Sequence, residues 1–368
     1  MSTQGHYTSI VEHMGFSDLI RAAEHKINTY GVRRKTRAGW LPKIVPYTGY
    51  GTTDRVHVIG RILMDDPTFD DSDSAAPGSR HTAAGQVENF AHEAQRGYRQ
   101  FFTVQVGDHP VQVHVGGEVV QTYTDSNGYF DVSIVGHGLE PGWGEVDVTA
   151  EGAEAVTAKV LITSSEETIG LISDIDDTIM VTNLPRALHA AYNSWFKKTN
   201  NRQPIPGMAK LYSELLKDHP NAPVFYLSTG AWNTFHTLEQ FIDDNNLPQG
   251  PLLLTDWGPT PTGLFRNGSE HKKVQLRNLI IDYPNIKWIL VGDNGQHDPL
   301  NYGDLAIEHP GAVAGIAIRE LTPTEHMLSH GTMSSLTGPP RTNRDAVPTI
   351  YGPDGHALLR EYQRKPFA

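Results

Sequence analysis

The chain has 368 residues and a formal net charge of −12 at pH 7. This length allows two domains of about 150 residues each, and the negative charge argues against nucleic-acid binding, which needs clustered Lys and Arg. The sequence has no cysteine, which excludes disulfides, thiol catalysis and cysteine-ligated zinc. It contains neither a signal-peptide pattern at its start nor an apolar stretch of about 18 residues. We therefore expect a cytoplasmic protein with at most peripheral membrane contact.

The first 52 residues are predicted to form a helix and a basic linker. Apolar residues recur at helical spacing between Ser17 and Tyr30, behind a capping Ser-Asp pair. The run over residues 33–37 holds four basic side chains and is followed by Trp40. Such a segment can touch an anionic membrane, but four charges are few, and a solvated linker is the favoured interpretation.

Residues 53–164 are predicted to form an all-β sandwich domain. Short alternating runs recur at 111–115, 119–123, 129–134, 145–149 and 155–162, separated by turn residues such as Asn127-Gly128. Several short strands at this spacing are typical of a β-sandwich. The region carries no group of residues suited to chemistry, so we expect an accessory domain, for which the sequence identifies no partner.

The next apolar run, from Ile169 to Ile172, ends in the carboxylates of Asp174, Asp176 and Asp177. Ligands of open α/β sheets bind outside the carboxyl ends of the strands. A solvated acidic turn is one interpretation. A calcium loop is excluded by spacing, since its sixth position would be Ile179 instead of Gly and its twelfth Pro185 instead of Glu. The third interpretation is a nucleophilic aspartate that forms an aspartyl phosphate, with Mg²⁺ screening the charge repulsion.

Polar residues follow three further apolar strands in ways that suit phosphate chemistry. Ser228 ends the strand 224–227 and can donate hydrogen bonds to a phosphoryl oxygen, as can its neighbour Thr229. The pair Lys272-Lys273 precedes an apolar helix and offers a fixed cation. The strand 288–291 leads into Asp293 and Asp298, and the strand predicted within 250–258 carries Asp256 at its end, to which no role is assigned.

These pieces resemble a known family. Asp174, Asp176 and Thr178 match the D-x-D-x-T motif of the haloacid dehalogenase (HAD) superfamily, and the run from Thr168 to about Ile318 resembles the catalytic domain of actin-patch-type phosphatidate phosphatases. The resemblance implies Asp174 as nucleophile and Asp176 as general acid and base. It also implies Thr178, Ser228 and Lys272 as phosphate-binding residues, with Thr229 and Lys273 as alternatives for the last two. Implied Mg²⁺ ligands are Asp174, Asp293 and the Asp176 carbonyl, with Asp298 beside them.

The resemblance implies an α/β HAD-like (Rossmannoid) parallel sheet over residues 165–325, with a small cap near 183–201 that leaves the site open. Gly, Pro, Ser and Thr dominate from 326 to 368, which predicts a mostly flexible tail with a short ordered end near 358–362. The expected function is Mg²⁺-dependent hydrolysis of a phosphomonoester, with phosphatidate as the implied substrate. A phosphoprotein or a soluble phosphomonoester is the alternative substrate, and a non-catalytic scaffold that binds through its β-sandwich is the alternative of another class.

Overall fold

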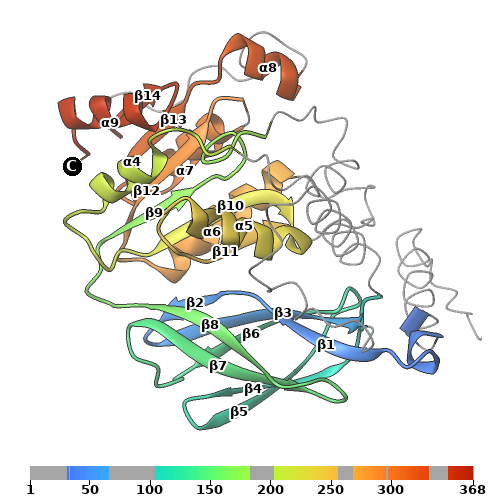
Figure 1. The fold of residues 1–368 in the computed structure, drawn as a ribbon. Helices are drawn as coiled ribbons and strands as arrows, with labels where there is room; N and C mark the ends of the chain where they lie inside the picture. Colours follow the sequence, from blue (N-terminus) through green and yellow to red (C-terminus); the bar gives the residue numbers. More distant parts are fainter. Residues whose placement is uncertain are drawn as a thin grey trace, which may run out of the picture.

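The computed structural model describes residues 31–32, 34–65, 104–182, 203–255, 268–295, 297–330 and 347–367. The strands of this part of the chain form two sheets, one of eight strands and one of six (Figure 1). None of the helices found in these ranges is long and apolar enough to cross a bilayer. The helix expected over 17–30, the cap expected near 183–201 and Asp256 lie outside the described residues.

The N-terminal sheet is hydrogen-bonded as one continuous sheet in the order β1-β3-β2-β8-β7-β4-β5, with β6 also paired to β3. Its strands are β1 (Leu41–Pro46), β2 (Gly49–Thr52), β3 (Arg55–Asp65), β4 (Pro110–Val115), β5 (Glu118–Tyr123), β6 (Tyr129–Val135), β7 (Gly142–Ala150) and β8 (Val156–Thr163). A β-sandwich was expected, which has two layers of strands. The parallel pairing of β2 with β8 instead joins the two layers, which lie one above the other in Figure 1.

The apolar core of this sheet comes from strict alternation along its strands. In β4, the side chains of Val111, Val113 and Val115 are buried, while the residues between them face outward. The sheet begins at Leu41, earlier than the expected boundary at residue 53. The basic residues before it had suggested a linker. Pro42 and Pro46 are tolerated because β1 is an edge strand of the sheet.

The second sheet is parallel throughout, in the order β11-β10-β9-β12-β13-β14. Its strands are β9 (Ile169–Ser173), β10 (Val224–Ala231), β11 (Leu252–Thr255), β12 (Lys287–Asp293), β13 (Val313–Arg319) and β14 (Thr349–Gly352). The central strands are apolar on both faces because helices cover both. This sheet confirms an α/β fold, and its strand order places β9 and β12 side by side at the centre.

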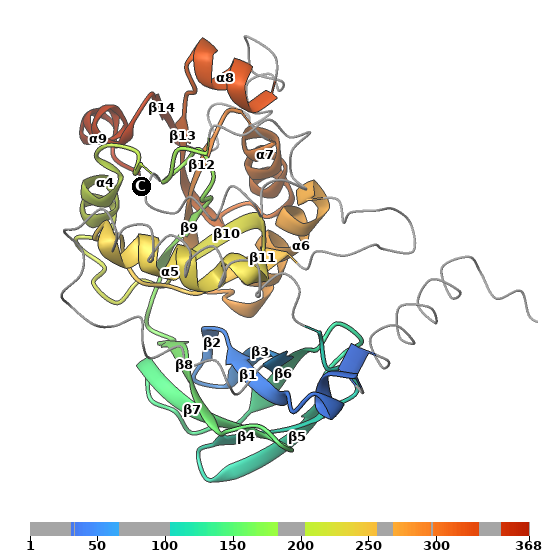
Figure 2. The same ribbon diagram turned by 45° about the vertical axis from the view of Figure 1, so that its right-hand side comes forward.

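Helices pack on both faces of the parallel sheet, with α4 and α9 together on one side and α6 and α7 on the other (Figure 2). The described helices are α4 (Met208–Leu215), α5 (Phe235–Asp244), α6 (Gly268–Asp282), α7 (Asp298–Glu308), α8 (Pro323–His330) and α9 (Gly355–Arg364), with a 3-10 turn η4 (Trp232–Thr234) before α5.

The end of the chain was predicted to be a mostly flexible tail with a short ordered end near 358–362, and the structure has helix α9 there with a further strand before it. Residues 349–352 form the edge strand β14, which pairs with β13, and α9 then packs on α4. The side chain of Asp354 caps α9 by accepting a hydrogen bond from the Ala357 amide. Leu358 on α9 is fully buried. Local composition masked these elements because a Gly- and Pro-rich stretch precedes them in the sequence.

Candidate active site

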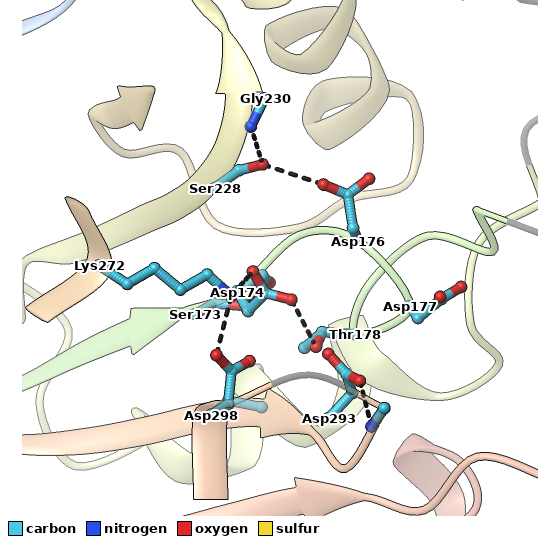
Figure 3. Close-up of polar contacts among 12 residues, drawn as sticks. Ser173, Asp174, Asp176, Asp177, Thr178, Ser228, Gly230, Lys272, Asp293 and Asp298 are labelled. Carbon is cyan, nitrogen blue, oxygen red and sulfur yellow. Dashed lines mark hydrogen bonds and ion pairs between the residues drawn. The ribbon is translucent and has the colours of Figure 1, made fainter. Parts of the chain in front are cut away.

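Three aspartates meet at the carboxyl ends of the two central strands. Asp174 directly follows β9, Asp293 is the last residue of β12, and Asp298 begins α7. The parallel pairing of β9 with β12 brings these ends together. One carboxylate oxygen from each of the three lies within 4.8 Å of the others (Figure 3). We call Asp174, Asp293 and Asp298 the three-aspartate cluster; all three are buried.

Lys272 enters this cluster from α6. Its Nζ donates to Asp174 Oδ1 at 2.6 Å and to Asp298 Oδ1 at 2.8 Å, and only 3% of the residue is exposed. The neighbouring Lys273 points elsewhere, with its Nζ 3.5 Å from Asp304 Oδ2 on α7. The structure therefore places Lys272, and not Lys273, beside the predicted nucleophile.

The electrostatics of the cluster favour an additional cation. Burial, the dominant cause, together with the charges of Asp298 and Asp176, raises the pKa of Asp174 to about 8 in spite of Lys272. Burial and the neighbouring Asp298 likewise hold the pKa of Asp293 well above its usual range. For Lys272, burial disfavours the charged form, but the surrounding carboxylates outweigh it and raise the pKa. One ammonium among three buried carboxylates leaves excess negative charge when all are ionised.

A tight loop after β9 orients the Asp174 side chain. The hydroxyl of Thr178 donates to Asp174 Oδ2 at 3.1 Å, so both carboxylate oxygens are held, one by Lys272 and one by Thr178. The loop closes through hydrogen bonds from the amides of Thr178 and Ile179 to the Ile175 carbonyl. Asp177 adopts a left-handed conformation with φ of 56°, which Asp tolerates better than most residues. Thr178, expected to bind phosphate, therefore contacts the predicted nucleophile Asp174 here.

Asp176 belongs to a second group of polar side chains beside the cluster. The Ser228 hydroxyl donates to Asp176 Oδ2 at 3.0 Å, and the Thr182 hydroxyl donates to Asp176 Oδ1 at 3.0 Å. Ser228 Oγ in turn accepts from the Gly230 amide at 2.9 Å. Figure 3 shows Asp176 turned toward Ser228 and away from Asp293 and Asp298. Its carboxylate thus takes no part in the three-aspartate cluster, and the Asp176 carbonyl remains a proposed metal ligand.

Ser228 and Thr229 were open alternatives in the sequence. The Ser228 hydroxyl reaches Asp176, while the Thr229 carbonyl accepts a hydrogen bond from Thr255 Oγ1 at 2.9 Å. Ser228 is fully buried next to the site, whereas Thr229 is only partly buried. The geometry therefore favours Ser228 as the side chain that can reach a bound phosphoryl group.

Two residues with roles in this site were missed by sequence reasoning. Thr182 contacts Asp176, as described, and its amide donates to Asp177 Oδ1 at 2.9 Å. Arg319, at the end of β13, donates from Nη1 to the Asp177 carbonyl at 2.8 Å and from Nε to the Pro353 carbonyl at 3.0 Å. For Arg319, the available signal in the sequence was a basic residue directly after the apolar run 313–318. No local pattern marked Thr182.

The α/β part of the chain is similar to a family of known proteins. Residues 169–320 match the family model described as "Phosphatidate phosphatase APP1, catalytic domain". This part of the chain is therefore APP1-like. The match confirms the predicted resemblance to the catalytic domain of actin-patch-type phosphatidate phosphatases, and we call residues 169–320 the APP1-like domain.

Curated relatives share this domain over part of their length. Over 152 residues the chain is 34% identical to phosphatidate phosphatase APP1 of Saccharomyces cerevisiae. This alignment covers 41% of the chain and 26% of the yeast protein. It is 26% identical over 205 residues to an uncharacterized protein of Schizosaccharomyces pombe, covering 55% of the chain and 32% of that protein. The chain thus spans at most about a third of either relative.

Among solved structures, a carbohydrate acetylesterase from Xanthomonas citri aligns over 74% of the chain and 68% of its own, at 10% identity and a TM-score of 0.27. That similarity is too low to support a statement about fold or function.

Proposed function

We propose that the chain is a Mg²⁺-dependent phosphatase that forms an aspartyl-phosphate intermediate on Asp174 and acts on phosphatidate. The observation that carries the proposal is the setting of Asp174, which is buried and held at one oxygen by Lys272 and at the other by Thr178. A carboxylate fixed at a strand end beside a lysine and two further aspartates suits nucleophilic attack on a phosphoryl group.

The residues of the cluster fit a magnesium ion. All candidate side-chain donors are carboxylate oxygens, the ligand type that Mg²⁺ prefers. Asp298 Oδ2 is buried and accepts no hydrogen bond from the described residues, so it is available to a ligand or to a metal-bound water. Asp174, Asp293 and the Asp176 carbonyl would hold the ion, with Asp298 beside them. A bound Mg²⁺ would offset the negative charge of the carboxylates and the phosphate.

The first chemical step follows from the positions of Asp174 and Asp176. An oxygen of the ionised Asp174 carboxylate attacks phosphorus, the ester P–O bond breaks, and the leaving alkoxide takes a proton from Asp176. In the second step, water attacks the phosphorus of the aspartyl phosphate and gives its proton to the Asp176 carboxylate. Orthophosphate leaves, and both side chains return to their starting states. Lys272 favours the ionised form of Asp174, although burial raises the pKa of that carboxyl to about 8, and it offsets the negative charge at the transferring group.

Asp176 must turn toward the leaving group for this proton transfer. In the structure both of its carboxylate oxygens accept hydroxyl hydrogen bonds, from Thr182 and Ser228. A phosphoryl oxygen that accepts a hydrogen bond from Ser228 would compete for the same hydroxyl. Phosphate binding would therefore free one oxygen of Asp176 at the moment at which the acid is required.

The substrate assignment rests on the relatives. The family and its S. cerevisiae member carry phosphatidate phosphatase in their names, which supports phosphatidate as substrate and diacylglycerol and orthophosphate as products. The same residues would also hydrolyse a phosphoprotein or a soluble phosphomonoester. A binding protein without catalysis has less support, because the nucleophile, the acid and the lysine are all present and in contact with suitable partners.

The deciding experiment measures phosphate release from dioleoyl phosphatidate in mixed micelles and from a panel of soluble phosphomonoesters, with Mg²⁺ or with EDTA. We expect Mg²⁺-dependent release that prefers phosphatidate and is abolished in Asp174→Asn. Asp304→Asn, which changes a partly exposed carboxylate on α7, is the control and should keep its activity. Cleavage of soluble esters alone would refute the lipid substrate, and an active Asp174→Asn variant would refute the nucleophile.

A further inference from the structure

An aromatic contact joins the N-terminal sheet to the APP1-like domain next to the active site. Tyr47 lies in the turn between β1 and β2, and its ring stacks on Trp232, with centroids 4.4 Å apart and an interplanar angle of 24°. The same ring lies 5.0 Å from that of Phe235, at the start of α5. Only 3% of Tyr47 is exposed, and its amide donates to the Ile59 carbonyl on β3 at 3.0 Å.

Trp232 immediately follows the irregular end of β10 that carries Ser228. The pairing of β10 with β11 shifts register between Leu227 and Ala231, so residues 228–230 do not follow the regular ladder. Irregular segments of this kind re-aim side chains next to active sites. Here the irregularity places Ser228 Oγ within reach of both the Gly230 amide and the Asp176 carboxylate. We call residues 228–232 the Ser228 segment.

The Ser228 segment is supported from two sides. On the β11 side, Thr255 Oγ1 lies 2.9 Å from the Thr229 carbonyl oxygen and 3.1 Å from that of Gly230. On the other side, Trp232 rests against Tyr47, which belongs to the N-terminal sheet. One support thus comes from the catalytic sheet itself and the other from a residue more than a hundred positions earlier in the chain.

The turn that carries Tyr47 is itself firmly placed on the APP1-like domain. Tyr50, on β2, contacts Phe225 of β10 edge to face at 5.3 Å, and Arg55, on β3, forms an ion pair with Asp282 at the end of α6. Tyr47, Tyr50 and Ile59 are part of the same buried apolar cluster as the core of the parallel sheet. The N-terminal sheet therefore offers a rigid surface rather than a loosely tethered neighbour.

From these contacts we propose that Tyr47 is a positioning residue for Ser228. The N-terminal all-β domain then helps to hold the active-site residue Ser228 in place and is more than an accessory module. The stacked ring holds Trp232, which limits the positions open to the Ser228 segment and keeps the hydroxyl aligned with Asp176. The kinetic part of this inference rests on the proposed phosphatase function. The structural part, that loss of the ring loosens residues 228–232, does not.

The test compares Tyr47→Leu, which removes the ring, with Tyr47→Phe, which keeps it. Hydrogen exchange is followed by mass spectrometry on full-length protein, on peptides covering 224–235 and on those covering β9 and β12. We expect Tyr47→Leu to speed exchange at least tenfold at residues 228–232 only, with Tyr47→Phe close to wild type. We also expect kcat/KM to fall about ten- to hundredfold in the Leu variant, because a group displaced by about 1 Å can cost that much.

Two further variants keep the test decisive. Trp232→Leu breaks the same contact from the catalytic side and should reproduce the local increase in exchange even if Tyr47→Leu does not fold. Tyr123→Leu changes an aromatic residue that is 66% exposed on β5, and it should leave exchange and kinetics unchanged. Unaltered exchange at 228–232 in the Leu variants, or an equal rise in the β9 and β12 peptides, would overturn the proposal. Local loosening in a protein that cleaves no ester would refute the phosphatase assignment alone.

Discussion

Replacing Asp174 with Asn should stabilise the metal-free protein at neutral pH while abolishing turnover. The folded protein holds the pKa of this carboxyl at about 8, against 3.8 for the free group, mainly through burial and then through the nearby charges of Asp298 and Asp176. Asn keeps the shape of the side chain and can still accept from Lys272. Lys272 also retains its ion pair with Asp298, so the substitution leaves no unpaired buried charge.

The sign and size of the effect follow from proton linkage. Because the pKa of the Asp174 carboxyl is higher in the folded than in the unfolded state, its protonation stabilises the fold. This contribution is fully present below pH 3.8 and is lost as the pH rises toward 8. In this window the folded state binds one proton more than the unfolded chain, so the free energy of unfolding falls by up to about 1.4 kcal/mol per pH unit. The Asn side chain does not titrate. Between pH 5 and pH 8 the stability difference should therefore move by about 4 kcal/mol in favour of Asp174→Asn.

The assay is urea unfolding in EDTA buffers at pH 5, 6, 7 and 8, followed by tryptophan fluorescence, to which the fully buried Trp288 of the parallel sheet contributes. Asp304→Asn is the matched control, because it removes a carboxylate whose side chain is 38% exposed and leaves the three-aspartate cluster intact. If the free energy of unfolding falls with pH equally steeply in wild type and in Asp174→Asn, the pKa of the Asp174 carboxyl is not raised as the structure indicates.

Further substitutions and additions probe the rest of the site. Mg²⁺ should raise the melting temperature of wild type more at pH 8 than at pH 6, because protons compete for the carboxylates, and Asp293→Asn should lose most of that rise. Lys272→Met should destabilise the fold by about 3–5 kcal/mol, because it removes a buried ammonium that pairs with two carboxylates. Lys273→Met should change stability by less than about 1 kcal/mol. Equal losses of stability for the two variants in denaturant titrations would contradict this. Thr182→Val should lower kcat about three- to tenfold, because it removes one hydrogen bond to Asp176 and a bond of this kind contributes an energy equivalent to that factor. Thr182→Ser, which keeps the hydroxyl, should restore kcat. A Val variant with wild-type kcat in phosphate-release assays would show that the bond does not matter.

The sequence was most informative where an apolar strand ends in a polar group. The β9 and β12 segments are apolar runs that predicted buried strands of a parallel sheet, and the family resemblance implied that Asp174, Asp293 and Asp298 meet at one site. The choice between Lys272 and Lys273 could not be made in the same way, because neighbouring helical residues point about 100° apart and only packing fixes which one faces the sheet.

Other features depend on tertiary contacts that leave no local pattern. Thr182 contacts Asp176 because the loop after β9 turns back on itself, and Tyr47 meets Trp232 because the two sheets pack against each other there. The strands β1 and β14 were missed because prolines or a Gly- and Pro-rich stretch stand beside them in the sequence. Each is an edge strand, where the need for alternating apolar residues is weakest.

The position of β14 and α9 has a consequence for how the protein is made. Until residues 349–364 leave the ribosome, the edge of β13 has no strand beside it and the surface of α4 has no α9 to cover it. An open strand edge with apolar neighbours is a site for aggregation. Synthesis therefore passes through a stage at which all the active-site residues have been translated but their sheet is incomplete. We expect chaperones to bind a nascent chain that stalls at this stage.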